Sequence, residues 1–425
     1  MTSLASRVKT KQLQISPSVN MSGVEYDVTY FFGCFLPMNT VLGGGPLVQA
    51  QLQDMLHVTP DLRDALCAIA ALHRSRLAQS MTVTGKRLEP PDVALQLYGK
   101  SVKSVNNRIL GNTFAGDCSM LWTTFFLGLF EVRLGHAKKK DCSHPDVNQL
   151  MCDPSGNNWL SHFLHGTCAI LRLQHPSSLA CQDQYNMYTR TFFLTTRIFE
   201  ISRSLIYSEP TFLSDPVWTD ALARLWSAEG AAVWHPKEAL FDMLPSISEL
   251  SIRALRFCDV EAASMTDGMR FHRAQDLGAE GLLLRQMLQE WWEMSNTWQH
   301  TSLKPDSELL VGHIYYHAIS IFHSGTYDYH VHWIQPDSPN APILTRSKID
   351  WHTHNILRLS RELLACGVAG VLLFFPLRVA GARVQSSRER EDILDLLHAV
   401  VQRGYVVADA ITSDLEELWS CNFVS

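Results

Sequence analysis

The stretch MLWTTFFLGLFEVRL at residues 120–134 decides the fold, because its side chains are apolar almost all the way round a helix. A helix of this kind is stable only when neighbouring elements cover every side of it. Thr123, Thr124, Glu131 and Arg133 interrupt the stretch, and it is shorter than the roughly 20 residues that span a bilayer. The sequence therefore predicts a central, buried helix of a soluble core.

Amphipathic helices are predicted on the N-terminal side of this central helix. The segment TPD at 59–61 supplies an N-cap, a proline for the first turn and an acid facing the positive end of the helix dipole. A helix should therefore begin there. Further along, apolar residues recur every three or four positions, which predicts a surface helix packed by one stripe. That stripe is Leu95, Tyr98, Val102, Val105 and Ile109.

Further helices are predicted along the rest of the chain, joined by short polar turns. Their expected ranges are 47–56, 159–173, 185–206, 217–226, 247–258, 276–294, 308–323 and 347–365. The sequence has no sustained two-residue alternation and no fixed repeat period. The expected fold class is therefore all-α, an irregular array of packed antiparallel helices.

The domain organisation follows from composition. Residues 1–23 lack periodicity, so we expect a flexible N-terminal arm. Neither Pro245 nor the segment 266–268 marks a composition break strong enough for a linker. We therefore expect residues 24–425 to form one helical domain.

The overall composition is that of a globular protein without a strong net electrostatic field. The 425 residues are 46% hydrophobic and 18% charged, and the formal net charge is −6. A chain of this length can bury a large core, but its charge does not draw it towards phosphate backbones. Binding of nucleic acid would need a local basic patch.

The cysteines favour an intracellular, reducing compartment. The chain has 10 Cys, and even its closest pair, Cys142 and Cys152, shows neither CxxC spacing nor a disulfide framework. The first 20 residues contain no apolar run of the secretory kind.

Several helices, read in order, resemble the fungal-specific transcription factor domain, the helical region that usually follows a binuclear zinc cluster. The similar segments are DLRDALCAIAALHRSRLA at 61–78, LQLYGKSVKSVNNRIL at 95–110, FFLGLFEVRLG at 125–135, WLSHFLHGTCAILRL at 159–173 and LLFFPLRVAGA at 372–382. Within the first, Ala70 to His73 stand at the matching places, and in the fourth Trp159, His162 and Gly166 do so.

The closing part of the chain also follows this family. An apolar helix is expected to break at Phe375-Pro376, a charged start follows at 388–392, and a last helix runs towards 414–419. The resemblance extends from Tyr26 almost to the C-terminus. It implies an all-helical regulatory region involved in transcriptional control, often of metabolic or secondary-metabolite pathways.

The family's zinc cluster has no counterpart in this sequence. A typical member begins with six Cys that hold two zinc ions and place a helix in the major groove. Only Cys34 precedes residue 67, and Arg7, Lys9 and Lys11 cannot replace six thiolates. Direct DNA recognition is therefore not expected, and the basic trio is interpreted as a solvated tail, with a leftover linker or weak import signal as the alternative.

Three functions remain open from the sequence. The first is a regulator without its own zinc cluster, which acts in the nucleus, or alternatively in the cytoplasm, through other regulators or a zinc-cluster relative, as a homo- or heterodimer. The second is a helical scaffold used as a biosynthetic enzyme or as a binder of a small metabolite. The third is a truncated gene model of a zinc-cluster factor that binds DNA.

Four groups of residues are candidates for metal or phosphate chemistry, but each has a structural interpretation that the sequence favours. His313 and His317 lie four apart, as in helical zinc sites, but the glutamate of HExxH is missing and aromatic residues stand between them. A loop holds His136, Cys142, His144 and Cys152 at spacings of no standard zinc pattern, beside the lysines at 138–140. The glycines at 43–45 lack a GxGxxG or GK[ST] continuation. The arginines Arg378, Arg383, Arg388 and Arg390 are expected to cap carbonyls and pair with Glu389, Glu391 and Asp392.

A fifth group of residues is expected either to pack in the core or to line a ligand cavity. Trp291 and Trp292, together with Leu284, Met287 and Leu288, form a thick apolar stripe. Such a stripe belongs to a core or lines a cavity between helices. The sequence assigns no catalytic, cofactor-binding or metal-binding residue, and no cofactor.

Overall fold

The computed structural model describes residues 23–39, 45–80, 92–111, 117–134, 157–179, 184–227, 234–301, 306–368, 370–405 and 408–421. Within these ranges the chain consists of helices and their connections, without a strand, which confirms the all-α prediction. Residues 1–22 of the expected arm lie outside the described residues, and Gly23 already begins the first helix.

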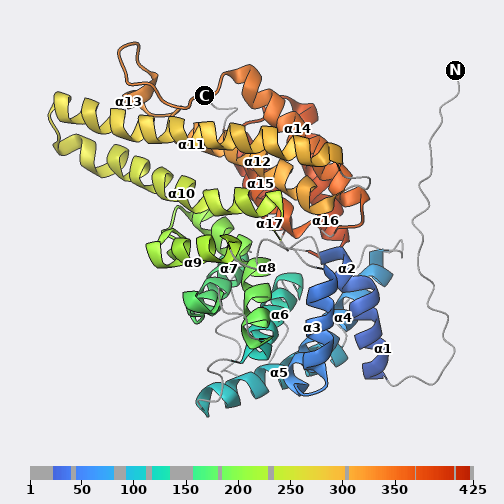
Figure 1. Cartoon of the computed structure of the whole chain (residues 1–425). Coiled ribbons are helices and arrows are strands. Elements are labelled where there is room, and N and C mark those ends of the chain that lie inside the picture. Colours follow the sequence, from blue (N-terminus) through green and yellow to red (C-terminus); the bar gives the residue numbers. More distant parts are fainter. Residues whose placement is uncertain are drawn as a thin grey trace, which may run out of the picture.

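The N-terminal part of the fold contains nine α-helices among the described residues. Their bounds are α1 Gly23–Tyr30, α2 Leu36–Asn39, α3 Gly45–Leu56, α4 Pro60–Ser80, α5 Asp92–Leu110, α6 Cys118–Leu134, α7 Asn157–Arg172, α8 Gln184–Tyr207 and α9 Pro216–Ser227. A π-helical turn, Phe31–Phe35, joins α1 to α2. Figure 1 shows α1 to α5 gathered at one end of the molecule, with α6 to α9 beside them.

The C-terminal part continues with longer helices. Their bounds are α10 Pro236–Arg256, α11 Asp267–Thr301, α12 Ser307–Gly325, α13 Val331–Ile334, α14 Arg346–Ala365, α15 Phe374–Gly381, α16 Ser387–Gln402 and α17 Ala408–Cys421. The long helices α10 and α11 pack against each other, and α12 contacts both of them (Figure 1). The chain then returns towards its beginning, because α16 contacts α4.

The central position of α6 is confirmed. It packs against α4, α5, α7 and α8, and buried side chains occur on every face of it, including Trp122, Phe126 and Phe130. Four neighbours are needed because no face of this helix is polar enough to meet water.

The apolar stripe predicted on α5 is wrong at both ends. Leu95 and Ile109 are exposed, whereas Ala94, Ser101 and Val105 are buried. In the first half of α5 the buried residues are therefore Ala94 and Ser101, each one position before the predicted Leu95 and Val102. Small side chains let α4 approach closely, and the Ser101 hydroxyl donates a 2.8 Å hydrogen bond to the carbonyl of Asp61.

Two prolines stand inside helices. Pro245 is buried inside α10, which begins at Pro236, before the predicted helix start at residue 247. Pro376 does not break a helix but stands in the first turn of α15, where its missing N–H would have no intrahelical partner. Helix α15 therefore runs across the position at which the sequence indicated a break.

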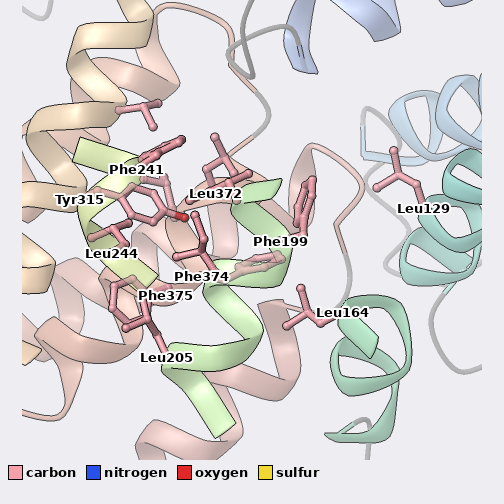
Figure 2. Close-up of a cluster of buried hydrophobic side chains, with 14 of the residues drawn as sticks. Leu129, Leu164, Phe199, Leu205, Phe241, Leu244, Tyr315, Leu372, Phe374 and Phe375 are labelled. Carbon is pink, nitrogen blue, oxygen red and sulfur yellow. The ribbon is translucent and has the colours of Figure 1, made fainter. Parts of the chain in front are cut away.

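Buried apolar side chains form one continuous cluster that runs from Tyr30 to Trp419. In its middle, Phe241 and Leu244 of α10, Tyr315 of α12 and Phe375 of α15 point towards one another (Figure 2). The ring of Tyr315 lies 5.5 Å from that of Phe241 and 5.9 Å from that of Phe375. The core thus joins helices that are more than a hundred residues apart in the sequence.

Candidate functional sites

Three candidate residues of the second half meet in an aromatic–histidine cluster between α11, α12 and α14, which consists of Trp292, His313, Tyr316, His317, Trp351 and His352. The Trp292 ring stacks on Tyr316 with centroids 4.6 Å apart and an interplanar angle of 14°. The same indole lies 4.8 Å from the His313 ring and 5.0 Å from the His317 ring. The two histidines therefore lie against an aromatic wall, as their aromatic neighbours in the sequence suggested.

Hydrogen bonds fix the orientation of these imidazoles. The Ser295 hydroxyl donates to the carbonyl of Trp292, so it accepts from Nε2–H of His313 at 3.1 Å. Nδ1 of His317 and Nδ1 of His352 lie 2.9 Å apart, so one of them donates and the other accepts. The ring that accepts in the His317–His352 pair must therefore be neutral, because a protonated imidazole has no free lone pair.

The electrostatics agree with that assignment. Burial, and secondarily the positive charge of Arg358, lowers the pKa of His313 to about 4. Burial, together with Lys348, lowers the pKa of His352 to about 4. Burial also holds the pKa of His317 well below its ordinary value, with His352 as the next cause. The cluster is thus uncharged at neutral pH.

His313 and His317 each use one nitrogen for a neighbouring side chain: Nε2 of His313 bonds to Ser295, and Nδ1 of His317 bonds to His352. Nε2 of His317 is buried without a hydrogen-bond partner in the described part of the chain. Within the ranges that the structure covers, no group of three or more His, Cys, Asp or Glu could hold a metal ion. The i, i+4 spacing here positions packing residues.

The tryptophan stripe of α11 divides into a buried and an exposed part. Trp291, Leu284 and Leu288 are buried, and Nε1–H of Trp291 donates a 2.7 Å hydrogen bond to the carbonyl of Pro236. Met287 is exposed. The stripe therefore packs α11 against α10 and α12.

A line of exposed apolar side chains follows the outer face of α11. Leu283, Met287, Met294 and Trp298 are all exposed, and their spacings of 4, 7 and 4 place them on one side of the helix. The exposed charged side chains between Leu283 and Trp298 are both acidic, Glu290 and Glu293. We call the four apolar residues the α11 stripe.

The structure also contains a cavity that the sequence did not reveal. It is small, and it lies between α2, α3, α6 and α8 and the segments around Val371 and Tyr405. Leu129 of α6 and Phe199 of α8 lie on two of its walls (Figure 2). The signal was missed because residues far apart in sequence close the cavity, and each was interpreted as ordinary core.

The arginine zone after Pro376 is dispersed. Arg383 forms a bidentate ion pair with Asp328, and Arg378 lies 3.9 Å from Asp414. Arg390 stacks over the ring of Trp419 at 5.3 Å. The expected pairing with Asp392 is wrong, because that carboxylate pairs with Arg361 at 2.6 Å.

Several sequence candidates lie outside the described residues. They are Arg7, Lys9, Lys11, Gly43, Gly44, His136, Lys138, Lys139, Lys140, Cys142, His144 and Cys152. Gly45 is described and begins α3. The helix predicted at 159–173 is confirmed as α7, although the side chains of Trp159 and His162 are not among those described.

Comparison with known proteins gives one match. The family model described as "Fungal specific transcription factor domain" matches residues 29–422, which confirms the resemblance inferred from the helical segments. No curated protein and no solved structure shows a significant match to the chain. Among the described helices, none has the length and apolar character that a bilayer crossing requires.

Proposed function

Because the chain belongs to the fungal specific transcription factor domain family, we propose that it regulates transcription in the nucleus by binding partner proteins. The family match over residues 29–422 carries this proposal, since it covers nearly all of the helical array. We take residues 24–425 as one regulatory unit that controls a metabolic or secondary-metabolite gene set, and we propose no catalytic role for it.

The α11 stripe is the surface that we assign to a partner. Four exposed apolar side chains on one helix face offer the kind of surface that an amphipathic helix covers. The acidic side chains beside them, Glu290 and Glu293, favour a partner helix whose apolar face is bordered by Lys or Arg. A regulator that carries a zinc cluster could present such a helix and supply the contact with DNA.

Deletion and complementation test this function. Transcript profiling of a deletion strain should show altered expression of a compact gene group, which the wild-type gene restores. A gene encoding Met287→Gln and Met294→Gln should fail to restore it, although the protein remains folded, because both side chains are exposed. The matched control is Leu110→Gln, an equally conservative change at an exposed leucine of α5.

Two outcomes would replace this proposal. If deletion leaves all transcripts unchanged and the purified protein turns over a pathway intermediate, the helical scaffold is an enzyme. If the 5′ end of the transcript encodes a cysteine-rich segment joined upstream of Met1, the native product binds DNA directly and the partner need not supply that contact.

A further inference from the structure

We propose that a second copy of this chain covers the α11 stripe, with helix α5 of one copy packed along the stripe of the other. This contact rests on the proposed function, in which the stripe binds a partner, and it names one occupant. Three observations carry it: an apolar face of α5 that the fold leaves partly exposed, a glycine in the middle of that face, and opposite charges beside the two helices.

Helix α5 has a partly exposed apolar face beside the face that it buries against α4. Leu95 and Ile109 are 38% and 48% exposed, and Val102 between them is half-buried. Gly99 and Asn106 complete this face, because the five residues follow one another at spacings of 4, 3, 4 and 3. Residues at these spacings present a continuous line of contacts to another helix. We call the five residues the α5 seam.

Gly99 stands in the middle of α5 without a reason that the fold supplies. A methyl group added at its Cα would meet nothing within 4 Å, so no neighbouring element requires a glycine there. Glycine destabilises the interior of a helix relative to alanine. On an exposed helix face, however, it lets a second helix with large side chains approach closely. Met294 and Trp298 of the α11 stripe are exposed side chains of that kind.

The charges beside the two faces have opposite signs. Lys103 is exposed beside the α5 seam, whereas Lys100 is already paired with Asp64 at 2.8 Å. Glu290 and Glu293 are exposed beside the α11 stripe. Two α5 helices, or two α11 helices, would bring like charges together, but α5 against α11 brings opposite charges together. Charge complementarity therefore favours the α5–α11 combination.

The two faces meet only between copies. Figure 1 shows α5 and α11 at opposite ends of the molecule. The faces match in length, because Leu95 to Ile109 and Leu283 to Trp298 each extend over about 21 to 23 Å at a rise of about 1.5 Å per residue. A contact of this length is small beside the roughly 1,200–2,000 Å² of a standard interface, so we expect weak, concentration-dependent association.

Substitution of the glycine tests the contact. Sedimentation equilibrium of the purified full chain should show self-association, and Gly99→Leu should weaken it at least about tenfold, because its side chain fills the space that the α11 side chains occupy. The same variant should not unfold at a lower temperature, since leucine favours a helix and has room there. The matched control is Gly268→Leu, at an equally open glycine of α11 that lies 15 residues before Leu283, and it should associate like the wild type. A wild-type chain that stays monomeric at all concentrations, or equal association of the two variants, would overturn the proposal.

Exchange of charges between copies tests which helices meet. Lys103→Glu and the double variant Glu290→Lys/Glu293→Lys should each self-associate about three- to tenfold more weakly than the wild type, because like charges then face each other. An equimolar mixture of the two proteins should recover the wild-type affinity, since each contact between unlike copies again joins opposite charges. A mixture that associates no better than either variant alone contradicts the α5–α11 contact.

Failure of this contact and failure of the proposed function give different results. If the chain stays monomeric but Met287→Gln and Met294→Gln abolish complementation, the stripe binds a different partner and only the second copy is excluded. If the chain associates through α5 and α11 but that gene restores the transcripts, the contact stands and the regulatory role of the stripe is wrong.

Discussion

Acidification should destabilise this protein well above the pH at which carboxylates titrate, because the imidazoles of the aromatic–histidine cluster are buried in their neutral form. His313 and His352 each have a folded-state pKa of about 4, and burial is the main cause in both. In the unfolded chain a histidine takes up its proton near pH 6.5. Between these two values the unfolded state binds more protons than the folded state, so the free energy of unfolding falls as the pH falls.

The expected size follows from the same two values. Lowering the pH from 7 to 5 should cost about 2 kcal/mol for each of the two histidines, and about 4 kcal/mol together if they titrate independently. Both side chains are almost fully buried, so solvent screening reduces this cost little. Against a typical stability of roughly 5–15 kcal/mol, such a loss is a large fraction.

Urea denaturation at a series of pH values between 7 and 5 measures this dependence. His352→Gln removes one titrating group and should reduce the loss of unfolding free energy over that range by about 2 kcal/mol. The control is His354→Gln, two residues along α14 at an exposed position, which should leave the dependence unchanged. A pH dependence that is the same in His352→Gln as in the wild type would refute the assignment of neutral, buried imidazoles.

Two further substitutions test the packing. Gly281→Ala should lower the free energy of unfolding by about 1–3 kcal/mol, because the added methyl group would overlap the buried hydroxyl of Tyr327. The control Gly268→Ala, in the open first turn of the same helix, should leave the free energy of unfolding unchanged or raise it by up to about 1 kcal/mol. If thermal unfolding shows the same change in stability for both variants, the predicted overlap with Tyr327 is wrong. Glu238→Gln should cost roughly 1–3 kcal/mol, because it removes one of the two carboxylates that pair with each of the buried Arg197 and Lys237. The exposed Glu362→Gln should change stability by less than about 0.5 kcal/mol. Chemical denaturation of the two glutamate variants measures this difference, and similar midpoints would disprove it.

The sequence predicted the helices well where local signals determine them. The segment TPD at 59–61 marked the start of α4 to the residue, and the composition of 120–134 marked α6 as central. Such signals act within a few residues, through caps, dipoles and the periodicity of side chains. These signals can therefore be recognised in a single sequence.

Burial was harder to predict at positions that depend on close packing between helices. The sequence placed Leu95 and Ile109 inside because they are large and apolar, but α5 buries Ala94 and Ser101 against α4. Small residues allow two helices to approach, and only the identity of the neighbour decides where that matters. Pro245 is a similar case, since its helix continues through a position that local rules disfavour.

The functional candidates divide in the same way. The packing role favoured for His313 and His317 agrees with their place against Trp292, because neighbouring aromatic residues indicated it. The cavity could not be inferred, because its walls include residues as distant as Asn39 and Tyr405. No periodicity connects positions 366 residues apart.

Buried ion pairs supply topological information that the apolar pattern lacks. A helix such as α6 is apolar on all faces, so hydrophobic burial alone would accept many neighbours. Charged side chains are more selective, because each needs a partner of opposite charge. Arg197 of α8 is buried and bonds to Glu238 of α10, and Arg383 after α15 bonds to Asp328 after α12. A packing that separated α8 from α10 would leave the buried charge of Arg197 without its partner, at a cost of several kcal/mol, and separation of the half-buried Arg383 and Asp328 would cost less. These pairs therefore destabilise alternative arrangements of the same helices. The paired residues lie 41 and 55 positions apart in the sequence, so local periodicity cannot predict which residues pair.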